Sequence, residues 1–446
     1  MKYFTLLLLS LVILASPILA QDYSDEDGLA GILEDDMLSG GELEVDLGGS
    51  FAQDPTETPE IETSAASLYR LSIDHAVSFR TGEIKSMVNN RTGLNLDYAG
   101  SLAAGLYAKI DATGTLYWAK DHRAQTAEKD YDYDGLIREA WVQKSYDQIN
   151  FKVGLQSIVW GDVEGAQATD TLNPTDNSEF LFVDFEDVRI GQATVLTNLY
   201  TDHFKLEAFV TPTPLFNKNP PSNSIYAYPN PFASLDVTEA EKPNPEYGAR
   251  VKFKVGASEM ALLAAKLTPN QPLYKLEGAG LTEVAQPFLL YGFNFNYPSG
   301  QTLFKADLGY KTDQGVNDQS FDLVFKDRLD AAFGVETTFS QHSLVASVSL
   351  STIQNWDESL VVAKQSGFYN LSWSKSYLNE DLTLNLGALG VISKSDTITS
   401  AIADYRTSDQ LQFSCRLFYF SVTDTDSQFY SFREENRAEI ASKYQF

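Results

Sequence analysis

The sequence is poor in cysteine and in basic residues, and each shortage excludes a class of protein. Cys415 is the only cysteine, so the chain cannot form an internal disulfide. Its 33 Lys and Arg stand against 61 Asp and Glu, which gives a formal net charge of −28. Because an acidic chain repels the phosphate backbone, no nucleic-acid partner is expected.

Long apolar runs are also missing, except at the amino terminus. There, Lys2 is followed by the run FTLLLLSLVILAS and by Ala20, a small residue suited to cleavage. This pattern predicts a secretory signal peptide over residues 1–20. No later run approaches the roughly 18 apolar residues that a membrane-spanning helix needs. A helical membrane protein is therefore not expected.

Motifs for enzymatic chemistry are absent as well. The sequence has no HExxH or CxxC motif, no phosphate-binding loop and no dinucleotide fingerprint. We therefore expect no enzyme activity, no catalytic residue and no resident cofactor.

What is present begins with an acidic segment. Residues 21–69 hold fourteen Asp and Glu and no Lys or Arg. This composition predicts a largely disordered periplasmic arm over residues 21–67. A short stretch at 28–38 has helical spacing of its apolar residues. The arm is interpreted as a solvated tail, as a plug for a pore, or as a docking arm for a periplasmic protein through residues 22–66.

From residue 68 onward, hydrophobic residues alternate with polar ones. In EYGARVKFKV (246–255), for example, Tyr247, Val251 and Phe253 alternate with Lys252 and Lys254. Period two is the signature of β-strands, and most candidate strands here have 9–13 residues, about the length that crosses a bilayer. The sequence therefore predicts an all-β domain over 68–446.

The connections between candidate strands alternate between short and long. Short turns such as TDH (201–203) and PSGQ (298–301) separate long loops such as 160–187 and 212–246. This alternation is typical of a single antiparallel transmembrane β-barrel with periplasmic turns and long outer loops.

Parity of the connections gives 18 strands as the best count, with 16 as the alternative. The count of 18 treats residues 92–111 as one long strand before a turn at DATG (111–114). It also treats residues 393–407 as an outer loop and SQFYSFR (427–433) as a strand.

The last strand carries the clearest likeness to a known class. In RAEIASKYQF, Phe446 and Tyr444 share one apolar face with alternating residues before them. This ending resembles the carboxy-terminal sorting signal of Gram-negative outer-membrane β-barrels, and the loop WGDVEGAQATDTLNPTDNSEF resembles loops of porin-like barrels. The resemblance implies location in the outer membrane, contact with its lipid, and recognition of Tyr444 and Phe446 by the barrel-insertion machinery.

A barrel of this size is too wide for strand side chains to fill, so the inward residues would line a lumen. The inward acids on the clearest strands are Asp74, Asp97, Glu207, Asp307 and Glu439. Ten bases face them, and this excess favours anions. The ten predicted lumen-lining bases are Arg70, Arg80, Lys152, Lys205, Lys252, Lys254, Lys305, Arg416, Arg437 and Lys443.

One long loop is unusually acidic. Carboxylate oxygens are ligands that calcium prefers, although no spacing here matches an EF-hand. The alternatives are a loop that folds inward to constrict the pore and a solvated external loop. The eight acids of this candidate constriction or calcium loop are Asp162, Glu164, Asp170, Asp176, Glu179, Asp184, Glu186 and Asp187.

Two hypotheses for function remain. The first is a porin-like channel for diffusion or export of a small polar solute, favoured as anionic. The alternative is a structural or partner-docking outer-membrane barrel, a secretion or assembly component that binds periplasmic proteins through the acidic arm.

Overall fold

The computed structural model describes residues 68–446 apart from 83–84, 180–187, 222, 228–236, 239–242, 279, 321, 393, 395, 426 and 428. The predicted signal peptide, the acidic arm at 21–67 and its short helix at 28–38 lie outside the described residues. No helix among the described residues is long and apolar enough to cross a membrane.

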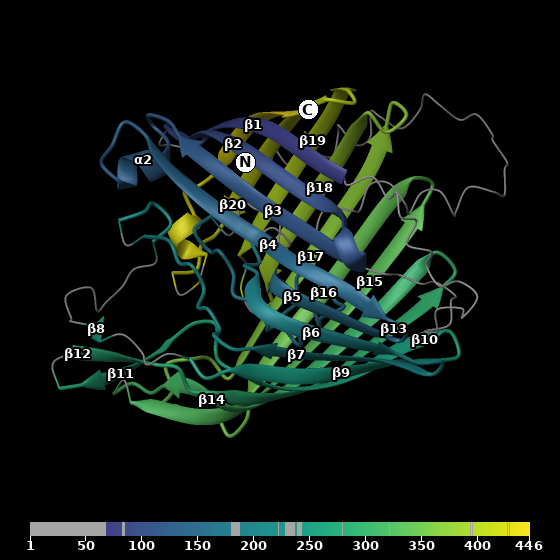
Figure 1. Cartoon of the computed structure of the whole chain (residues 1–446). Coiled ribbons are helices and arrows are strands. Elements are labelled where there is room, and N and C mark those ends of the chain that lie inside the picture. Colours follow the sequence, from purple (N-terminus) through teal and green to yellow (C-terminus); the bar gives the residue numbers. More distant parts are fainter. Residues whose placement is uncertain are drawn as a thin grey trace. The chain divides into compact units, whose positions relative to one another are not determined.

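Eighteen antiparallel strands form one closed sheet (Figure 1). Each barrel strand pairs with its neighbours along the chain, and β1 also pairs with β21, which closes the barrel without an open edge. The strands are β1 (Leu68–Arg80), β2 (Met87–Leu102), β3 (Leu106–Tyr117), β4 (Asp132–Tyr146), β5 (Ile149–Gln156), β6 (Gln192–Tyr200), β7 (Phe204–Thr211), β9 (Glu246–Val255), β10 (Ser258–Leu267), β13 (Phe288–Ser299), β14 (Thr302–Asn317), β15 (Leu323–Phe339), β16 (His342–Ile353), β17 (Gln365–Tyr377), β18 (Leu382–Val391), β19 (Thr397–Ser408), β20 (Leu411–Ser421) and β21 (Arg437–Gln445).

The connections separate into two ends, as the sequence predicts. At the turn end, adjacent strands are joined by a few residues, for example 147–148 and 409–410. At the loop end, on the left of Figure 1, the connections include 157–191 and 212–245. The loop end also carries α2 (His122–Thr126), η2 (Tyr430–Phe432) and a small sheet of β8 (Val237–Thr238), β11 (Leu273–Glu277) and β12 (Gly280–Val284), while η1 (Ala103–Gly105) forms a turn.

The count of 18 strands is confirmed, but two local assignments behind it are wrong. Residues 92–111 are not one strand, because the chain turns at Ala103–Gly105, where Ala104 and Gly105 have φ of 64° and 68°. The predicted DATG turn lies inside β3 instead, where Asp111 pairs with Arg138. The true turn has Gly105 as its one typical turn residue among apolar neighbours, while Asp111 and Gly114 of DATG gave a false signal.

The second error lies near the carboxy terminus. The predicted outer loop 393–407 is largely strand β19, and the predicted strand 427–433 belongs to a loop that contains η2. β19 turns Ile398 toward an inner apolar cluster, so its faces do not show the usual polar-inside pattern. Phe429 and Phe432 gave this segment the aromatic content of a strand, but they are buried at the loop end.

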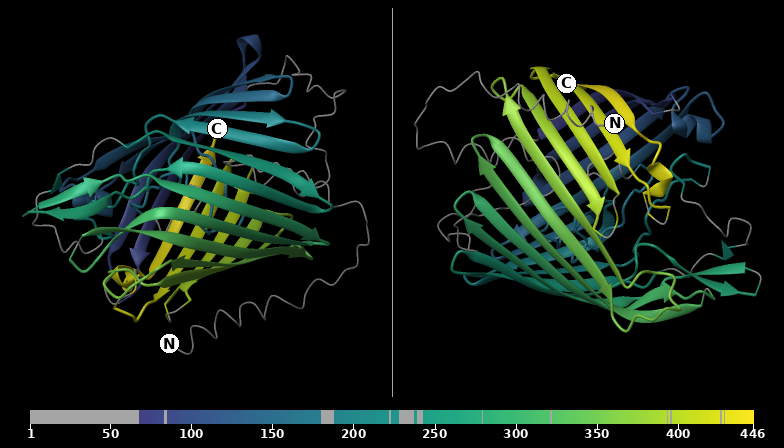
Figure 2. Two further views of the ribbon diagram at one scale, coloured as in Figure 1. Left: turned by 90° about the horizontal axis from the view of Figure 1, so that it is seen from below. Right: turned by 180° about the vertical axis from the view of Figure 1, so that it is seen from behind.

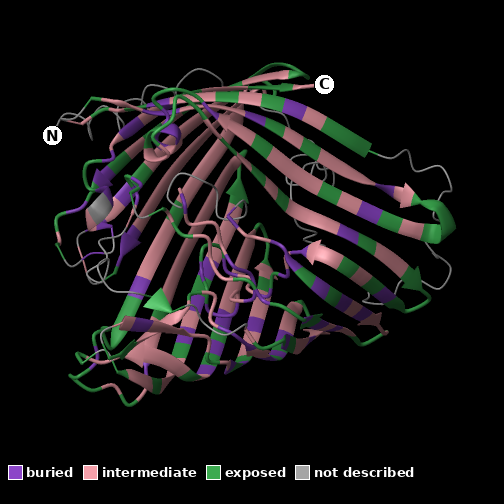
Figure 3. Cartoon of the chain, turned by 60° about the vertical axis from the view of Figure 1, so that its left-hand side comes forward, coloured by how far each residue is buried: buried purple, intermediate pink, exposed green. Residues whose placement is uncertain are grey.

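Side chains on the outer face are apolar and exposed because no other part of the protein covers them. Leu262 on β10, Leu371 on β17 and Ile440 on β21 are examples, and such residues appear as regularly spaced exposed positions along the strands (Figure 3). Tyr444 and Phe446, the predicted insertion signal, lie together at the turn end with ring centroids 5.1 Å apart. An apolar outer face suits a barrel surrounded by lipid.

The inner face carries a hydrophobic core of its own. Leu196, Phe209, Leu263 and Leu290 project inward from β6, β7, β10 and β13, where they pack against loop residues that include Trp160. Trp160 is completely buried, and its Nε1 donates to Glu207 Oε1 at 2.5 Å. The views in Figure 2 show loop segments within the ring of strands. The segment around Trp160 is therefore held against the wall by burial of apolar surface.

We expect Trp160→Ala to lower the free energy of unfolding by about 3–5 kcal/mol, because it leaves a cavity in this inner core. The measurement is urea unfolding of the protein refolded in detergent micelles. Val159→Ala is the matched control, since the neighbouring Val159 is 39% exposed. Equal loss of stability in the two variants would contradict the inner core described here.

Candidate functional site

A segment of the connection between β5 and β6 lies inside the barrel; residues 157–179 are called the inner loop. The backbone N–H groups of Asp162 and Val163 both donate to Asp307 Oδ2 on β14, each at 2.9 Å. Ser347 Oγ on β16 donates to the carbonyl of Glu164 at 2.9 Å. The inner loop thus reaches from β5 across the inner faces of β14 and β16.

Close packing fixes the height of the inner loop above the wall. Val163, Ala166 and Ala168 form a buried cluster with Ala332 of β15. A Cβ at Gly309 would lie 2.2 Å from the carbonyl oxygen of Ala168, so only glycine permits this approach. Small residues therefore let the inner loop lie directly on the strands.

Most of the ten predicted lumen bases have acidic or aromatic neighbours. Arg70 and Lys443 are exposed at the turn end, and Lys254 is half-buried near it on β9. The remaining contacts are Arg80 and Arg437 with Glu435, Lys252 with Glu259, Lys305 with Glu336, Arg416 with Glu439, Lys152 over the Trp141 ring and Lys205 over the Tyr200 ring.

Some of the acids in these pairs were not predicted from the sequence to face the lumen. Glu259, Glu336 and Glu435 were not among the five predicted inward acids, yet each pairs with a predicted base. Strand register brings together Lys252 with Glu259 and Lys305 with Glu336, whereas Glu435 lies in the connection just before β21. A period-two pattern gives the face of a residue but not its neighbour across the ladder, so it could not reveal the pairs between strands.

The predicted acidic loop separates into different environments. Asp184, Glu186 and Asp187 lie outside the described residues. Within the part of the chain that the structure describes, no three acidic, His or Cys side chains gather to hold a metal ion, so we do not propose a calcium site. The other contacts are Asp162 with Asn296, the Glu164 carbonyl with Ser347, Asp170 with Arg189, Asp176 with Lys218, and Glu179 with Arg91 and His122.

One wall of the lumen is uncharged and rich in hydroxyl groups. The outward positions of β16 and β17 include Leu350 and Leu371, which are about half exposed, and the alternating inward positions carry serine and asparagine. Gly165 of the inner loop lies beside Asn370 on this wall. The inward serines are Ser343, Ser347, Ser349 and Ser351 on β16, and Ser366, Ser372, Ser374 and Ser376 on β17.

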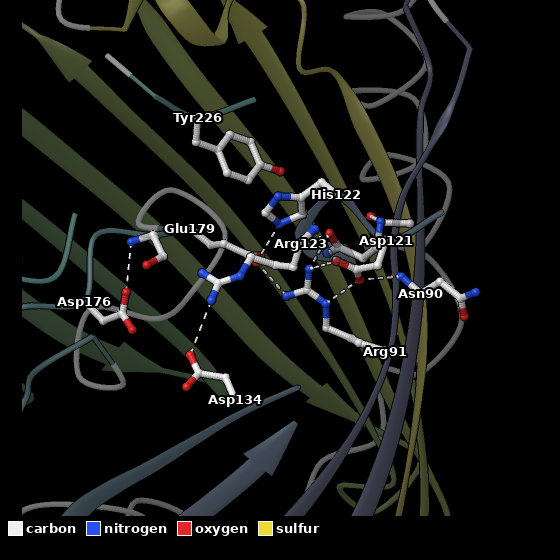
Figure 4. A network of polar contacts seen from close by, with 12 residues as sticks. Asn90, Arg91, Asp121, His122, Arg123, Asp134, Asp176, Glu179 and Tyr226 are labelled. Atoms are coloured by element: carbon white, nitrogen blue, oxygen red, sulfur yellow. Dashed lines mark hydrogen bonds and ion pairs between the residues drawn. The ribbon is translucent and has the colours of Figure 1, made fainter. Parts of the chain in front are cut away.

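Charged contacts connect the inner loop with the opposite wall near the loop end (Figure 4). Glu179 Oε1 accepts from Arg91 Nη1 at 2.7 Å and lies 2.8 Å from His122 Nε2. Asp121 Oδ2 accepts from Arg91 Nε at 3.0 Å, and its side chain also caps the start of α2. This network joins β2, α2 and the end of the inner loop.

A second contact continues this network toward β21. Arg437 Nη2 donates to the hydroxyl of Tyr226, whose ring lies edge-on to His122 with centroids 4.9 Å apart. Tyr226 also belongs to a buried aromatic cluster with Phe429 and Phe432. Segments from three long connections therefore pack together over the ends of β2 and β17–β21. In the sequence, the neighbouring pair Asp121 and His122 did not indicate this arrangement.

The ion pairs set the charge of Glu179. Burial alone would raise the pKa of its carboxyl, but the Arg91 guanidinium and the hydrogen bond with His122 hold that pKa well below its usual range. Glu179 therefore stays ionised in the folded protein at pH values where a free glutamate binds a proton.

We expect this pair to make folding stability depend on acid. A lowered folded pKa contributes stability that is complete above about pH 5 and declines as the pH falls below the unfolded value near 4.3. Glu179→Gln should lower the free energy of unfolding at pH 7 by about 1–3 kcal/mol and flatten its fall between about pH 5 and 3. Urea unfolding across this range tests it, with the exposed Glu128→Gln as control. Parallel pH curves for wild type and Glu179→Gln would contradict it.

Solved porin structures share this architecture. A BenF-like porin from Pseudomonas fluorescens Pf-5 aligns with a TM-score of 0.51 and 10% identity, covering 85% of this chain and 98% of that chain. Pseudomonas aeruginosa OccK2 (OpdF) aligns with a TM-score of 0.50 and 12% identity over the same shares. Identities this low establish the fold, which is that of Gram-negative outer-membrane porins, and carry no information on the solute.

A search of curated proteins finds no match. A family described as "Protein of unknown function (DUF1302)" matches residues 74–426, which include nearly all of the barrel. Because this match spans well over half of the chain, the protein belongs to the DUF1302 family.

Proposed function

We propose that the protein is an outer-membrane channel for a small polar, anionic solute. The observation that carries the proposal is the inner loop, an irregular segment anchored to the inner wall because its backbone donates to Asp307 and accepts from Ser347. A loop in this position narrows a lumen without filling it with strand side chains, which is how a wide barrel becomes selective.

The outer surface supports a membrane setting. Its exposed apolar side chains lie on alternate positions of strands that run from short turns to long connections. An exposed apolar band with segregated connections suits a barrel that crosses the outer membrane. The aromatic pair Tyr444 and Phe446 supports recognition by the insertion machinery of that membrane.

The inner surface supports passage of a hydrated solute. The serine wall on β16 and β17 offers hydroxyl groups that both donate and accept hydrogen bonds. Lys152 on β5 lies 3.9 Å from the centroid of the Trp141 ring on β4. Near the loop end, Lys311 and Arg328 share one carboxylate, that of Asp330, among the described residues. Closely spaced positive groups of this kind favour anions.

The alternative is a barrel that docks periplasmic proteins through residues 22–66. Those residues lie outside the described part of the chain, so no described contact favours that hypothesis over the channel.

The decisive measurement is single-channel conductance of the purified protein in a planar lipid bilayer under a potassium chloride gradient. We expect stable current steps and a reversal potential that indicates preference for chloride, because the proposed pore is hydrated and positive side chains gather at its loop end. Absence of steps, in wild type and after deletion of residues 22–66, would contradict the channel.

We further expect Asp307→Ala to raise the single-channel conductance, because it removes the acceptor that holds Asp162 and Val163 against β14. Asp327→Ala is the matched control, since Asp327 on β15 contacts Tyr310 and the backbone of Asp313 rather than the inner loop. Equal conductance in Asp307→Ala and wild type would mean that the inner loop does not limit the current.

A further inference from the structure

A small cavity lies between the inner loop and the loop-end halves of β14 and β15. Its volume is about 240 Å³, below the roughly 300–1,000 Å³ of typical ligand pockets, so it suits a ligand no larger than a single sugar unit. Gln167 and Thr171 line it from the inner loop, and Gln314 and Arg328 line it from the two strands.

Positive side chains line the cavity closely. Arg189 contacts Asp170 at 2.7 Å, while Lys311 and Arg328 share Asp330 at 2.7 and 2.9 Å. Among the described residues, two cations therefore meet one carboxylate at Asp330. Lys311 is only 1% exposed, so the surrounding solvent screens its charge weakly.

Two buried polar groups on the cavity wall point to a ligand with hydroxyl groups. Thr171 Oγ1 and Gln314 Nε2 are both buried, and neither has a hydrogen-bond partner among the described residues. Leaving such groups unpaired costs free energy, so they mark positions where a bound polar molecule is favoured. A hydroxyl can accept from the amide of Gln314 and can donate to or accept from the hydroxyl of Thr171.

The rim of the cavity is fixed before any ligand binds. Asn270 Nδ2 donates to the carbonyl groups of Thr171 and Asn173, at 3.2 and 2.8 Å. The backbone N–H of Asn217 donates to the Asn270 carbonyl at 2.8 Å. One amide side chain and one backbone hydrogen bond thus join three long connections around the opening, and such preorganisation reduces the entropy lost on binding.

We propose that this cavity is a recognition site for a small polyhydroxylated carboxylate, a hydroxy acid of single-sugar size. The carboxylate meets Lys311 and Arg328, which share Asp330, and the hydroxyl groups meet Thr171 and Gln314. The inference rests on the proposed channel function, because it names the chemical class of solute that the channel receives at its loop end.

Isothermal titration calorimetry of the full chain in detergent micelles tests the site, with sodium gluconate as the probe. Glucose supplies the hydroxyl groups without the charge, and acetate supplies the charge without the hydroxyl groups. Gluconate should bind at least about tenfold more tightly than either, since each lacks one set of contacts. Equal or weaker binding of gluconate would overturn the proposal.

Two near-isosteric variants test the residues themselves. Thr171→Val and Gln314→Leu should each weaken gluconate binding about tenfold, because each removes one buried hydrogen-bonding group. Glu128→Gln, an exposed residue outside the cavity, is the control and should bind gluconate like wild type. Unchanged affinity in both cavity variants, with circular dichroism showing a folded barrel, would overturn the site.

Conductance of the same preparations separates this inference from the proposed function. Current steps without gluconate binding would overturn the recognition site and leave the channel in place. Gluconate binding without current steps would contradict the channel and leave the site in place.

Discussion

The interior of this barrel depends on one constraint, which is that an irregular segment inside a ring of strands must find partners for its backbone. The N–H groups of Asp162 and Val163 find theirs in a single carboxylate oxygen of Asp307, and the carbonyl of Gln167 accepts from Lys311. The charged side chains of Asp307 and Lys311 thus supply hydrogen bonds that water or a neighbouring strand supplies elsewhere. The apolar packing around Trp160 adds a second anchor on the opposite side of the inner loop.

The charged side chains inside the barrel are also mostly paired with neighbours. A lumen surrounded by charge would impose a strong field, but most of the described bases lie beside acids on neighbouring strands. Positive side chains gather at the loop end, where Lys311 and Arg328 share the carboxylate of Asp330. The serine wall of β16 and β17 offers hydrogen bonds without charge. In the proposed channel, selectivity therefore depends on a small region of the wall.

Alternation of residue types was enough to predict the closed barrel and its segregated ends. The count of 18 is correct because the false strand at 427–433 took the place of the missed β19. Alternation failed in two places where the residue types did not match the local structure. The turn at Ala103–Gly105 consists mostly of apolar residues, and DATG, which is typical of a turn, lies inside β3. It failed again at β19, which turns Ile398 inward, because loop aromatics cover that part of the lumen.

The sequence predicted less of the candidate site than of the fold. The acidic loop stood out by composition, yet its partners are distant in the chain: Arg91 lies 88 residues before Glu179, and Asp307 lies 145 residues after Asp162. Nothing in the pattern of either segment indicates the other. The cavity depends on Thr171 and Gln314, which are unremarkable residues until the register of β14 and the path of the inner loop bring them to one wall.

The long separation between the inner loop and its wall has a consequence for the order of assembly. The loop is synthesised between β5 and β6, but its anchors belong to β14 and β16, which come later in the chain. Docking on these anchors must therefore wait until those strands have joined the sheet, and long-range contacts of this kind form slowly. Packing around Trp160 needs only strands up to β13, so apolar contacts of the inner loop can form before its hydrogen bonds to β14 and β16.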